Sequence, residues 1–296
     1  MAVTPDLTAE AQRLAPAVAV GRPALARQLI ADRTALAGVV VVAVVLLVAL
    51  AAPLLAPHDP TAQDVLHRLQ SPSAEHPLGT DHLGRDELSR IIYGARTSVL
   101  AALGIGMAIL LAGVLVGLVS GLAGGFVDGL IMRIVDVVLA FPSLLLALAV
   151  VGTLRPGLLH LALAMIAVWW VDYARLVRGL VLGVKEHSFV EAARAQGAGP
   201  VRIALRHVLP NVASPVIVLA TLQTARLLLG LAALSFLGLG VGPPTAEWGA
   251  MLSEGKDFLA NAPQLMLWPG LAITITALGL NLLGDGLRDV LDSNLR

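Results

Sequence analysis

The residues of this chain with the clearest chemical task lie in one polar stretch, residues 188–211, between two long apolar stretches. Its ionisable side chains are one glutamate, three arginines and one histidine. Helical spacing assembles no serine–histidine–aspartate set, and the chain has no His-Glu-x-x-His pattern, so neither nucleophilic catalysis nor metal-assisted hydrolysis is indicated. Two short helices with a Gly-Pro break between them instead favour docking against another protein.

Local signals in this stretch predict a helix, a turn and a second helix. Ser188 and Glu191 have the S-x-x-E spacing of a capping box, in which two side chains cap the first turn of a helix. Gly197 predicts the turn. Pro200 suits the first turn of the next helix, which Pro210 is expected to end. That helix is expected to carry apolar residues on one face and arginines on another: Val201, Leu205 and Val208, then Arg202 and Arg206.

The rest of the chain is suited to lipid. Of its 296 residues, 57% are hydrophobic and only 14% are charged, which is more apolar surface than a soluble domain of this length could bury. A bilayer core needs roughly 20 apolar residues per helix. We predict an all-α membrane protein with six spans near residues 34–56, 97–121, 127–151, 158–182, 212–240 and 266–287. In the second span a row of glycines at helical spacing predicts close helix packing: Gly113, Gly117 and Gly121.

The distribution of lysine and arginine predicts the orientation in the membrane. With the N-terminus inside, 13 of these residues fall in cytoplasmic segments and six fall outside, in line with the positive-inside rule. Both termini and the polar stretch are therefore expected in the cytoplasm, and residues 57–96 on the other side.

Composition excludes several classes of chemistry. The chain has no cysteine, and therefore no disulfide, thiolate ligand or cysteine nucleophile. A formal net charge of zero gives no reason to expect nucleic acid binding. Lys185 and Lys256 are the only lysines, and neither completes a G-x-x-x-x-G-K-[ST] P-loop, so any ATP-driven work must come from a partner.

The polar stretch also resembles a known motif. Its Glu-Ala-Ala triplet, the glycine four residues later and the following Leu-Pro pair resemble the EAA loop of ABC importer permeases. In that family the loop is the coupling helix, which sits in a cleft of the cytoplasmic ATPase. The resemblance assigns ATPase coupling to residues 188–209. The individual residues that it points to are Glu191, Ala192, Ala193, Gly197, Arg202, Leu209 and the following Pro210. His207 stands where the family often has isoleucine.

Three further segments resemble the dipeptide, oligopeptide and nickel permeases within that family. Residues 76–98 contain HPLGTDHLGRDELSR before the second span, residues 234–249 begin with LSFLGLG, and residues 281–292 read NLLGDGLRDVLD. Two positions depart from the pattern. Leu231 stands where members often have an acidic residue, and Ser293 replaces the usual proline.

The resemblance implies the type I ABC importer permease fold, location in the bacterial inner membrane, and a transport subunit rather than an enzyme. A second, homologous permease would complete the translocation path, and two cytoplasmic ATPase domains would dock below it. An extracytoplasmic binding protein would deliver a di- or oligopeptide. ATP and magnesium would be bound by the ATPase, so no cofactor is expected in this chain. Nickel chelates, glutathione and haem-like cargo use similar permeases, and a secondary transporter is the alternative from a different class.

The spans and the resemblance together divide the chain into five parts. These are a cytoplasmic N-terminal tail (1–33), a first anchor helix (34–56), an extracytoplasmic loop (57–96), a permease core (97–288) with its coupling loop (183–211), and a cytoplasmic C-terminus (289–296).

Ionisable residues inside apolar spans are functional candidates because burying them is costly. Arg226 lies in the middle of the fifth span with no other charge in that span. It is expected either to line the translocation path and meet a peptide carboxylate, or to pair with an acid from another helix or from the partner permease. For Asp136 and Asp172 the sequence predicts local pairs, with Arg133 and Arg175 three residues away.

The segment before the second span carries three further candidates, Asp81, Arg85 and Asp86. They are expected either to contact a binding protein or to form a solvated turn with local pairs. Histidines at positions 58, 67, 76 and 82 are spaced by nine, nine and six residues. That spacing matches no metal site, so no metal is expected there.

Overall fold

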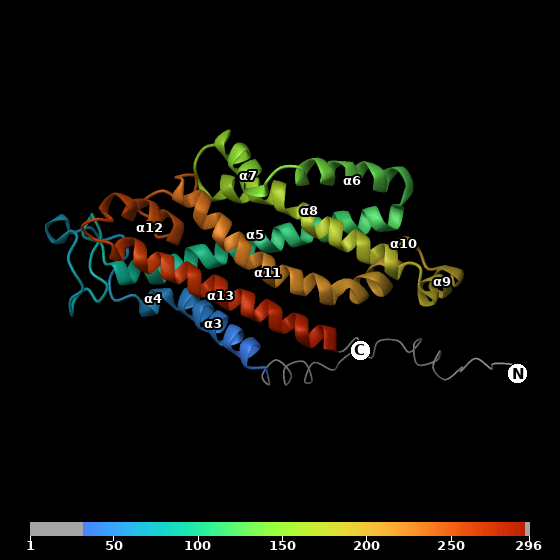
Figure 1. The fold of residues 1–296 in the computed structure, drawn as a ribbon, viewed down its shortest axis with the longest axis horizontal. Helices are drawn as coiled ribbons and strands as arrows, with labels where there is room; N and C mark the ends of the chain where they lie inside the picture. The colour runs from blue at the N-terminus through green and yellow to red at the C-terminus, as the bar shows by residue number, and fades with distance from the viewer. Residues whose placement is uncertain (1–31, 294–296) are drawn as a thin grey trace, which may run out of the picture.

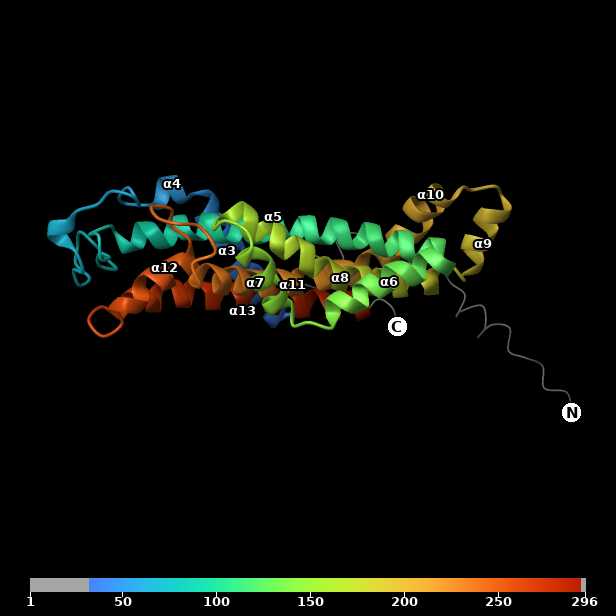
Figure 2. The ribbon, with the colours of Figure 1, turned by 90° about the horizontal axis from the view of Figure 1, so that it is seen from above.

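Apolar stretches of this length become helices in a membrane because only a helix or a closed barrel bonds every backbone N–H and C=O group internally. The computed structural model describes residues 32–293, in which long helices run side by side (Figures 1 and 2). Within this range there is no strand, only an isolated bridge between Thr80 and Asp86, so the all-α prediction is confirmed. Most of the predicted N-terminal tail lies outside the described residues.

Five helices among the described residues are long and apolar enough to cross a membrane. They are α3 (Arg33–Leu50), α5 (Glu87–Ala123), α8 (Leu158–Val184), α11 (Leu209–Phe236) and α13 (Gln264–Ser293). The fourth candidate span, Pro200–Phe236, includes the helical turns that precede α11.

The predicted span near 127–151 is not one straight helix. It consists of α6 (Gly125–Leu139) and α7 (Ser143–Gly152), which meet at 88°. Pro142 lies at the break as the N-cap of α7. Because proline has no N–H to donate and restricts the residue before it, α6 cannot continue through this point. Counted as one broken span, the pair brings the number of candidate spans to six.

Two helices differ in their bounds from the predicted spans for local reasons. α5 begins ten residues before the predicted span because the Asp86 carboxylate accepts a hydrogen bond from the Ser89 N–H at 2.8 Å and caps the helix. The first span ends at Leu50, and a short helix, α4 (Ala52–Leu55), follows. Pro53 occupies the first turn of α4, where a missing N–H leaves no helical bond unmade.

The glycine row of the second span packs α5 closely against α8, as the sequence predicts. A Cβ atom on Gly117 would lie 2.7 Å from Cβ of Val177, and one on Gly121 would lie 2.7 Å from Cβ of Val181. Both distances are too short for non-bonded carbons, so only glycine permits this approach. In lipid, such close packing takes over the role that the hydrophobic effect plays in water.

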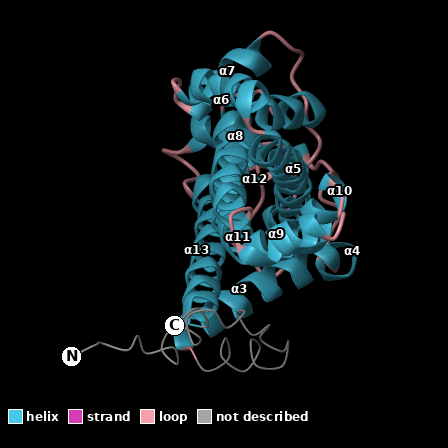
Figure 3. Ribbon diagram, turned by 90° about the vertical axis from the view of Figure 1, so that its right-hand side faces the viewer, coloured by secondary structure: helices cyan, strands magenta, loops and turns pink. Residues whose placement is uncertain are grey.

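The two ends of the bundle carry different short elements. One end, which we call the α12 end, holds η1 (Val65–His67), α12 (Trp248–Gly255) and η3 (Lys256–Phe258). The other end, the α9 end, holds α9 (Ser188–Ala195) and α10 (Pro200–Ile203) (Figure 2). Figure 3 looks along the bundle from the α9 end and shows α3 and α7 at opposite edges.

Candidate functional site

The polar stretch at the α9 end forms the predicted helix, turn and helix. α9 is followed by Gly197, whose φ of 83° lies in the left-handed region that favours glycine. The N–H of Gly197 bonds the carbonyl of Arg194, and the N–H of Ala198 bonds that of Ala193, both at 3.0 Å. This pair of bonds is a Schellman motif. Pro200 then occupies the first turn of α10, as predicted.

The predicted capping box is wrong. His187 is the N-cap of α9, no side chain caps the helix, and Ser188 is already its first helical residue. The helix starts one residue early because the His187 carbonyl accepts the N–H of Val190 at 2.9 Å and that of Glu191 at 3.2 Å. The Glu191 side chain is therefore not used as a cap, and it is exposed together with its neighbour Ala192.

The second helix does not end at Pro210. α10 passes into a π-helical turn, η2 (Ala204–Val208), and then directly into α11. Pro210 lies in the first turn of α11, where its missing N–H is tolerated. The N–H of Leu209 bonds the carbonyl of Ala204, five residues back, which is the bond that defines a π turn.

The π turn also changes which side chains of this helix are buried. Val208 is fully buried, whereas Val201 is 69% exposed and Leu205 is 59% exposed, so the predicted apolar face is wrong. The buried positions are Ile203, which lies outside the predicted face, and Val208, which belongs to it. They belong to one apolar cluster that includes residues of α8, α9 and α11: Val177, Val181, Val190, Ile203, Val208, Val212 and Val216. Both arginines of the second helix, Arg202 and Arg206, are exposed.

The α12 end contains a buried ion-pair network. A solvated turn was one of the two expectations from the sequence for this segment. The Nε atom of Arg85 lies 2.5 Å from Asp81, and its Nη2 atom lies 2.5 Å from Glu254 of α12. Arg90 lies 2.8 Å from the same glutamate, and the side chains of both arginines are at most 1% exposed. Asp86 is also buried, where it caps α5. The turn is therefore buried and not solvated as predicted, although the predicted local pairing occurs between Asp81 and Arg85.

Sequence reasoning missed Glu254 and Arg90 because their partners are far away in the chain, and spacing gives no signal for such pairs. The same holds for Glu247, which caps α12 and accepts a hydrogen bond from the Ser98 hydroxyl at 3.0 Å. In the sequence, the Glu-Trp-Gly triplet that begins at Glu247 is the feature that could have drawn attention to this contact.

Charged residues in the spans pair between helices, not within them. Asp136 of α6 lies 2.5 Å from Arg175 of α8, so the predicted local pair of Asp136 with Arg133 is wrong. Asp172 accepts a hydrogen bond from the Gln223 amide of α11 at 2.9 Å, so its predicted pair with Arg175 is wrong as well. Both differences arise because neighbouring helices bring a partner closer than the next turn of the same helix does.

Arg226 takes part in the second of these contacts. Its Nη1 atom lies 3.5 Å from the Oε1 atom of Gln223, which links it to Asp172 on α8. Gln223 is 3% exposed, while Arg226 is exposed on the surface of this chain in the middle of α11. The guanidinium therefore faces outward from the bundle at mid-span and has a polar neighbour but no direct ion pair among the described residues.

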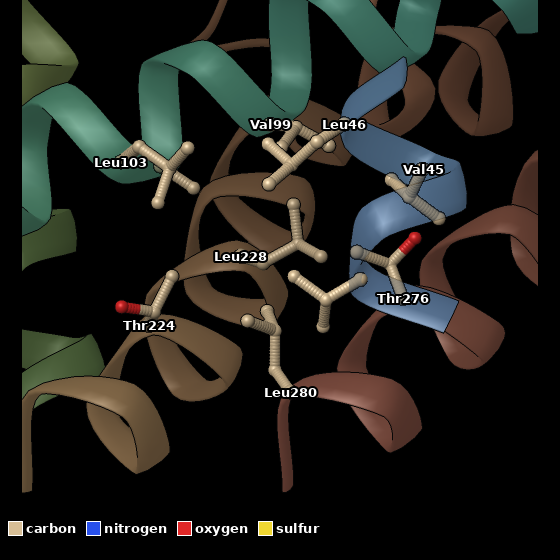
Figure 4. A pocket seen from close by; sticks show the side chains of 10 residues that line it. Val45, Leu46, Val99, Leu103, Thr224, Leu228, Thr276 and Leu280 are labelled. Atoms are coloured by element: carbon tan, nitrogen blue, oxygen red, sulfur yellow. The ribbon is translucent and has the colours of Figure 1, made fainter. Parts of the chain in front are cut away.

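An apolar pocket between α3, α5, α11 and α13 offers no polar handle for a ligand (Figure 4). Its walls are aliphatic except for Thr224 and Thr276. Their hydroxyls donate to carbonyls of their own helices, at 2.8 Å for Thr224 and 2.7 Å for Thr276. The pocket therefore reflects helix packing and is no candidate for binding a polar cargo.

The histidines of the segment before α5 do not gather into one group. His67 is exposed and lies 2.7 Å from Asp64; that hydrogen bond raises the pKa of His67 and lowers the pKa of Asp64. The His82 ring stacks on Phe258. His58 and His76, by contrast, lie next to each other, with ring centroids 4.9 Å apart.

Comparison with known proteins assigns these features to a family. Residues 113–296 match the family described as binding-protein-dependent transport system inner membrane component. Residues 24–72 match the N-terminal TM domain of oligopeptide transport permease C. The chain belongs to the first of these families. The matched region runs from the middle of α5 to the C-terminus and contains the whole α9 end.

Three relatives show how closely this permease resembles characterised transport systems. It is 43% identical to the dipeptide transport system permease protein DppC of Alkalihalophilus pseudofirmus, over 91% of this chain and 89% of the relative. It is 42% identical to the nickel transport system permease protein NikC of Escherichia coli K12, over 86% and 92%. It is 44% identical to the glutathione transport system permease protein GsiD of Escherichia coli O6:K15:H31, over 86% and 84%.

The resemblance to ABC importer permeases is thereby confirmed. The permease is an inner membrane component of an importer that depends on a binding protein. Like its relatives, it is a subunit of a transport system. The partners that this family implies are a binding protein and an ATPase.

Proposed function

We propose that this permease forms half of the translocation path of an ATP-driven importer for di- or oligopeptides. The single observation that supports it best is the 43% identity with a dipeptide permease, over nine-tenths of both chains. A second, homologous permease would supply the other half of the path, with both termini and the α9 end in the cytoplasm. In that orientation the α12 end would face the binding protein.

The α9 end would couple the path to the ATPase. Glu191, Ala192 and Arg202 are exposed and available for a partner. The buried residues of the same segment pack against Val177 and Val181 of α8 and continue into α11. A force on α9 would therefore be transmitted directly to two spanning helices. This chain binds no nucleotide in the proposal, since ATP and Mg²⁺ would belong to the partner.

The α12 end would present a loop of fixed shape to the binding protein. Asp81, Arg85 and Asp86 are buried, so their part in this contact would be to hold the loop. The surface available to a partner would be the exposed residues around them, such as Gln63 and Leu66.

Arg226 would face the translocation path and meet the carboxylate of the peptide. An arginine in a membrane stays charged and needs water or an acid beside it, and a water-filled path supplies the first. We expect Arg226→Gln to lower uptake of a dipeptide with a free carboxylate, while a dipeptide with a C-terminal amide is affected little. The measurement is uptake into vesicles that contain the complete importer, alongside the yield of the assembled complex.

Two outcomes would reject this role of Arg226: equal loss of uptake for both peptides, or a loss of complex yield in proportion to the loss of uptake. The second would mean that Arg226 pairs with an acid of the partner permease. The same vesicles test the cargo itself. Since the relatives named for nickel and for glutathione are as similar as the dipeptide relative, uptake of a nickel chelate or of glutathione in preference to dipeptides would overturn the peptide proposal.

A further inference from the structure

Two histidines and one aspartate from separate parts of the chain meet at the α12 end. His58 follows α4, His76 lies in the loop after η1, and Asp86 is the N-cap of α5. The Nδ1 atom of His76 lies 2.9 Å from Oδ1 of Asp86, and the Nδ1 atom of His58 lies 3.8 Å from Oδ2 of the same carboxylate. One possible ligand atom from each of the three residues lies within 4.8 Å of those of the other two.

His58 has an unused ring nitrogen that points into this group. Its Nδ1 atom is buried and has no hydrogen-bond partner, although the side chain as a whole is 37% exposed. A buried nitrogen without a partner costs free energy, so an ion or another polar species is expected beside it. The exposed part of the ring leaves a way in from solvent.

Neighbouring groups hold the carboxylate of Asp86 and the backbone of both histidines in this arrangement. Ser89 is fully buried; its N–H donates to Oδ2 of Asp86 at 2.8 Å, and its hydroxyl accepts the N–H of His58 at 3.0 Å. The hydroxyl of Ser73 accepts the N–H of His76 at 3.0 Å. A contact such as that of Ser89 with the Asp86 carboxylate orients a ligand in metal sites.

We propose that His58, His76 and Asp86 form a binding site for a divalent transition-metal ion, with Zn²⁺ as the best match. Two imidazole nitrogens and one carboxylate oxygen are a common ligand set for this ion. Tetrahedral zinc with bonds of about 2.0–2.2 Å places its ligand atoms about 3.3 Å apart. The two observed separations, 2.9 Å from His76 to Oδ1 of Asp86 and 3.8 Å from His58 to Oδ2, involve different oxygens of the carboxylate and lie on either side of that value. A water molecule would complete the coordination from the exposed edge of His58.

A second group of possible ligands at the same end is not suited to a cation. Asp81, His82 and Glu254 are also close together. Their two carboxylates, however, are already occupied by the guanidinium groups of Arg85 and Arg90. A metal ion there would have to displace two buried cations. The first group has only Asp86 as a charged member and no arginine on its carboxylate in any described contact.

The proposed ion would join three segments that are distant in sequence. It would tie the chain after α4 to the loop and to the first turn of α5. The first spanning helix would thereby be attached to the permease core at the α12 end. Zinc binding should therefore raise the melting temperature of the complex, since an ion that binds only the folded state stabilises it.

The test is a titration of Zn²⁺ into the assembled, nucleotide-free importer, purified without a histidine tag. The parent complex should bind Zn²⁺, and His58→Ala should weaken its affinity. Loss of a group that only contacts a ligand costs roughly 10–100-fold in metal affinity, so loss of the ligand itself should cost more. The matched control is His67→Ala, because His67 is an exposed histidine of the same segment outside the group. It should bind like the parent.

Equal zinc affinity in the parent and in His58→Ala would overturn the proposal, as would an equal rise in melting temperature. His58→Ala should assemble normally, since the Nδ1 atom makes no hydrogen bond. If it does not assemble, the visible spectrum of the parent complex with Co²⁺ decides. Tetrahedral nitrogen and oxygen coordination absorbs strongly, and a spectrum equal to that of hydrated Co²⁺ would reject the site.

Discussion

The short helices at the two ends of this permease are held by different kinds of contact. At the α12 end, buried guanidinium and carboxylate groups join the loop before α5 to α12: Asp81, Arg85, Arg90 and Glu254. The buried contacts of α9 and α10 at the other end are apolar, and they are supplied largely by valines of α8, α9 and α11. The Arg178–Asp128 ion pair lies between α8 and α6, outside this cluster. The charges of the α9 end, among them Glu191 and Arg202, are exposed.

This difference indicates what each end can do. Hydrogen-bonded ion pairs are directional, so the α12 end is held in one geometry. Apolar contacts have no preferred direction, so helices at the α9 end can shift against one another and stay packed. An end with one fixed shape suits recognition of a docked protein, whereas an end that can move while its charges face outward suits the transfer of motion from an ATPase.

The largest expected effect comes from breaking the network at the α12 end. Glu254→Gln leaves two buried guanidinium groups without this carboxylate, and breaking a buried pair by removing one partner costs about 3–5 kcal/mol. We expect a clear fall in the melting temperature of the purified complex. The matched control is Asp257→Asn, an exposed acid three residues further along. Equal melting temperatures for the two variants would show that the α12 end is not held by these pairs.

A smaller effect on stability, but a large effect on transport, is expected at Gly197. Valine cannot adopt a φ of 83° without strain of about 1–3 kcal/mol, so Gly197→Val should distort the turn between α9 and α10. We expect the complex to assemble and hydrolyse ATP but to lose coupled uptake. Gly199→Val is the control, because Gly199 has a φ of −70° and no atom near the position of a Cβ. Full coupling in Gly197→Val would contradict the role of this turn.

The smallest effect on stability is expected for Glu191→Ala. The Glu191 side chain is exposed and caps no helix, so its loss should change the free energy of unfolding by no more than about 0.5 kcal/mol. If Glu191 belonged to a capping box, its removal would lower the free energy of unfolding by about 1 kcal/mol. Uptake should nevertheless fall if the carboxylate meets the ATPase. A variant that transports like the parent would remove Glu191 from the coupling contact.

Much of the fold could be predicted because membrane spans are determined by local composition. Apolar length located the spans, and the glycine row of α5 identified the face that packs on α8. The turn at Gly197 and the helix start at Pro200 were also predictable, since a left-handed φ and a missing N–H are properties of single residues. The broken span was not predicted, although Pro142 marks the break between α6 and α7.

Several of the errors share one physical cause, which is that a side chain meets a partner from a distant part of the chain. Asp136 pairs with Arg175 of α8 and not with Arg133 on its own helix. Arg85 keeps its local partner Asp81 and also meets Glu254, 169 residues away, which the sequence did not suggest. His58 and His76 come together only because α4 and the loop fold over the start of α5. Spacing along the chain carries no information about such contacts.

The most direct measurement of the central claim, that the α9 end docks on the ATPase, uses single cysteines in a chain that has none of its own. Ala192→Cys lies on the exposed face of α9, and Gln63→Cys lies at the α12 end as the control. In inside-out vesicles an impermeant thiol reagent should label position 192 when the ATPase is absent and not when it is bound, while position 63 should react only in intact cells. Labelling of position 192 from outside intact cells, or equal labelling with and without the ATPase, would contradict the account.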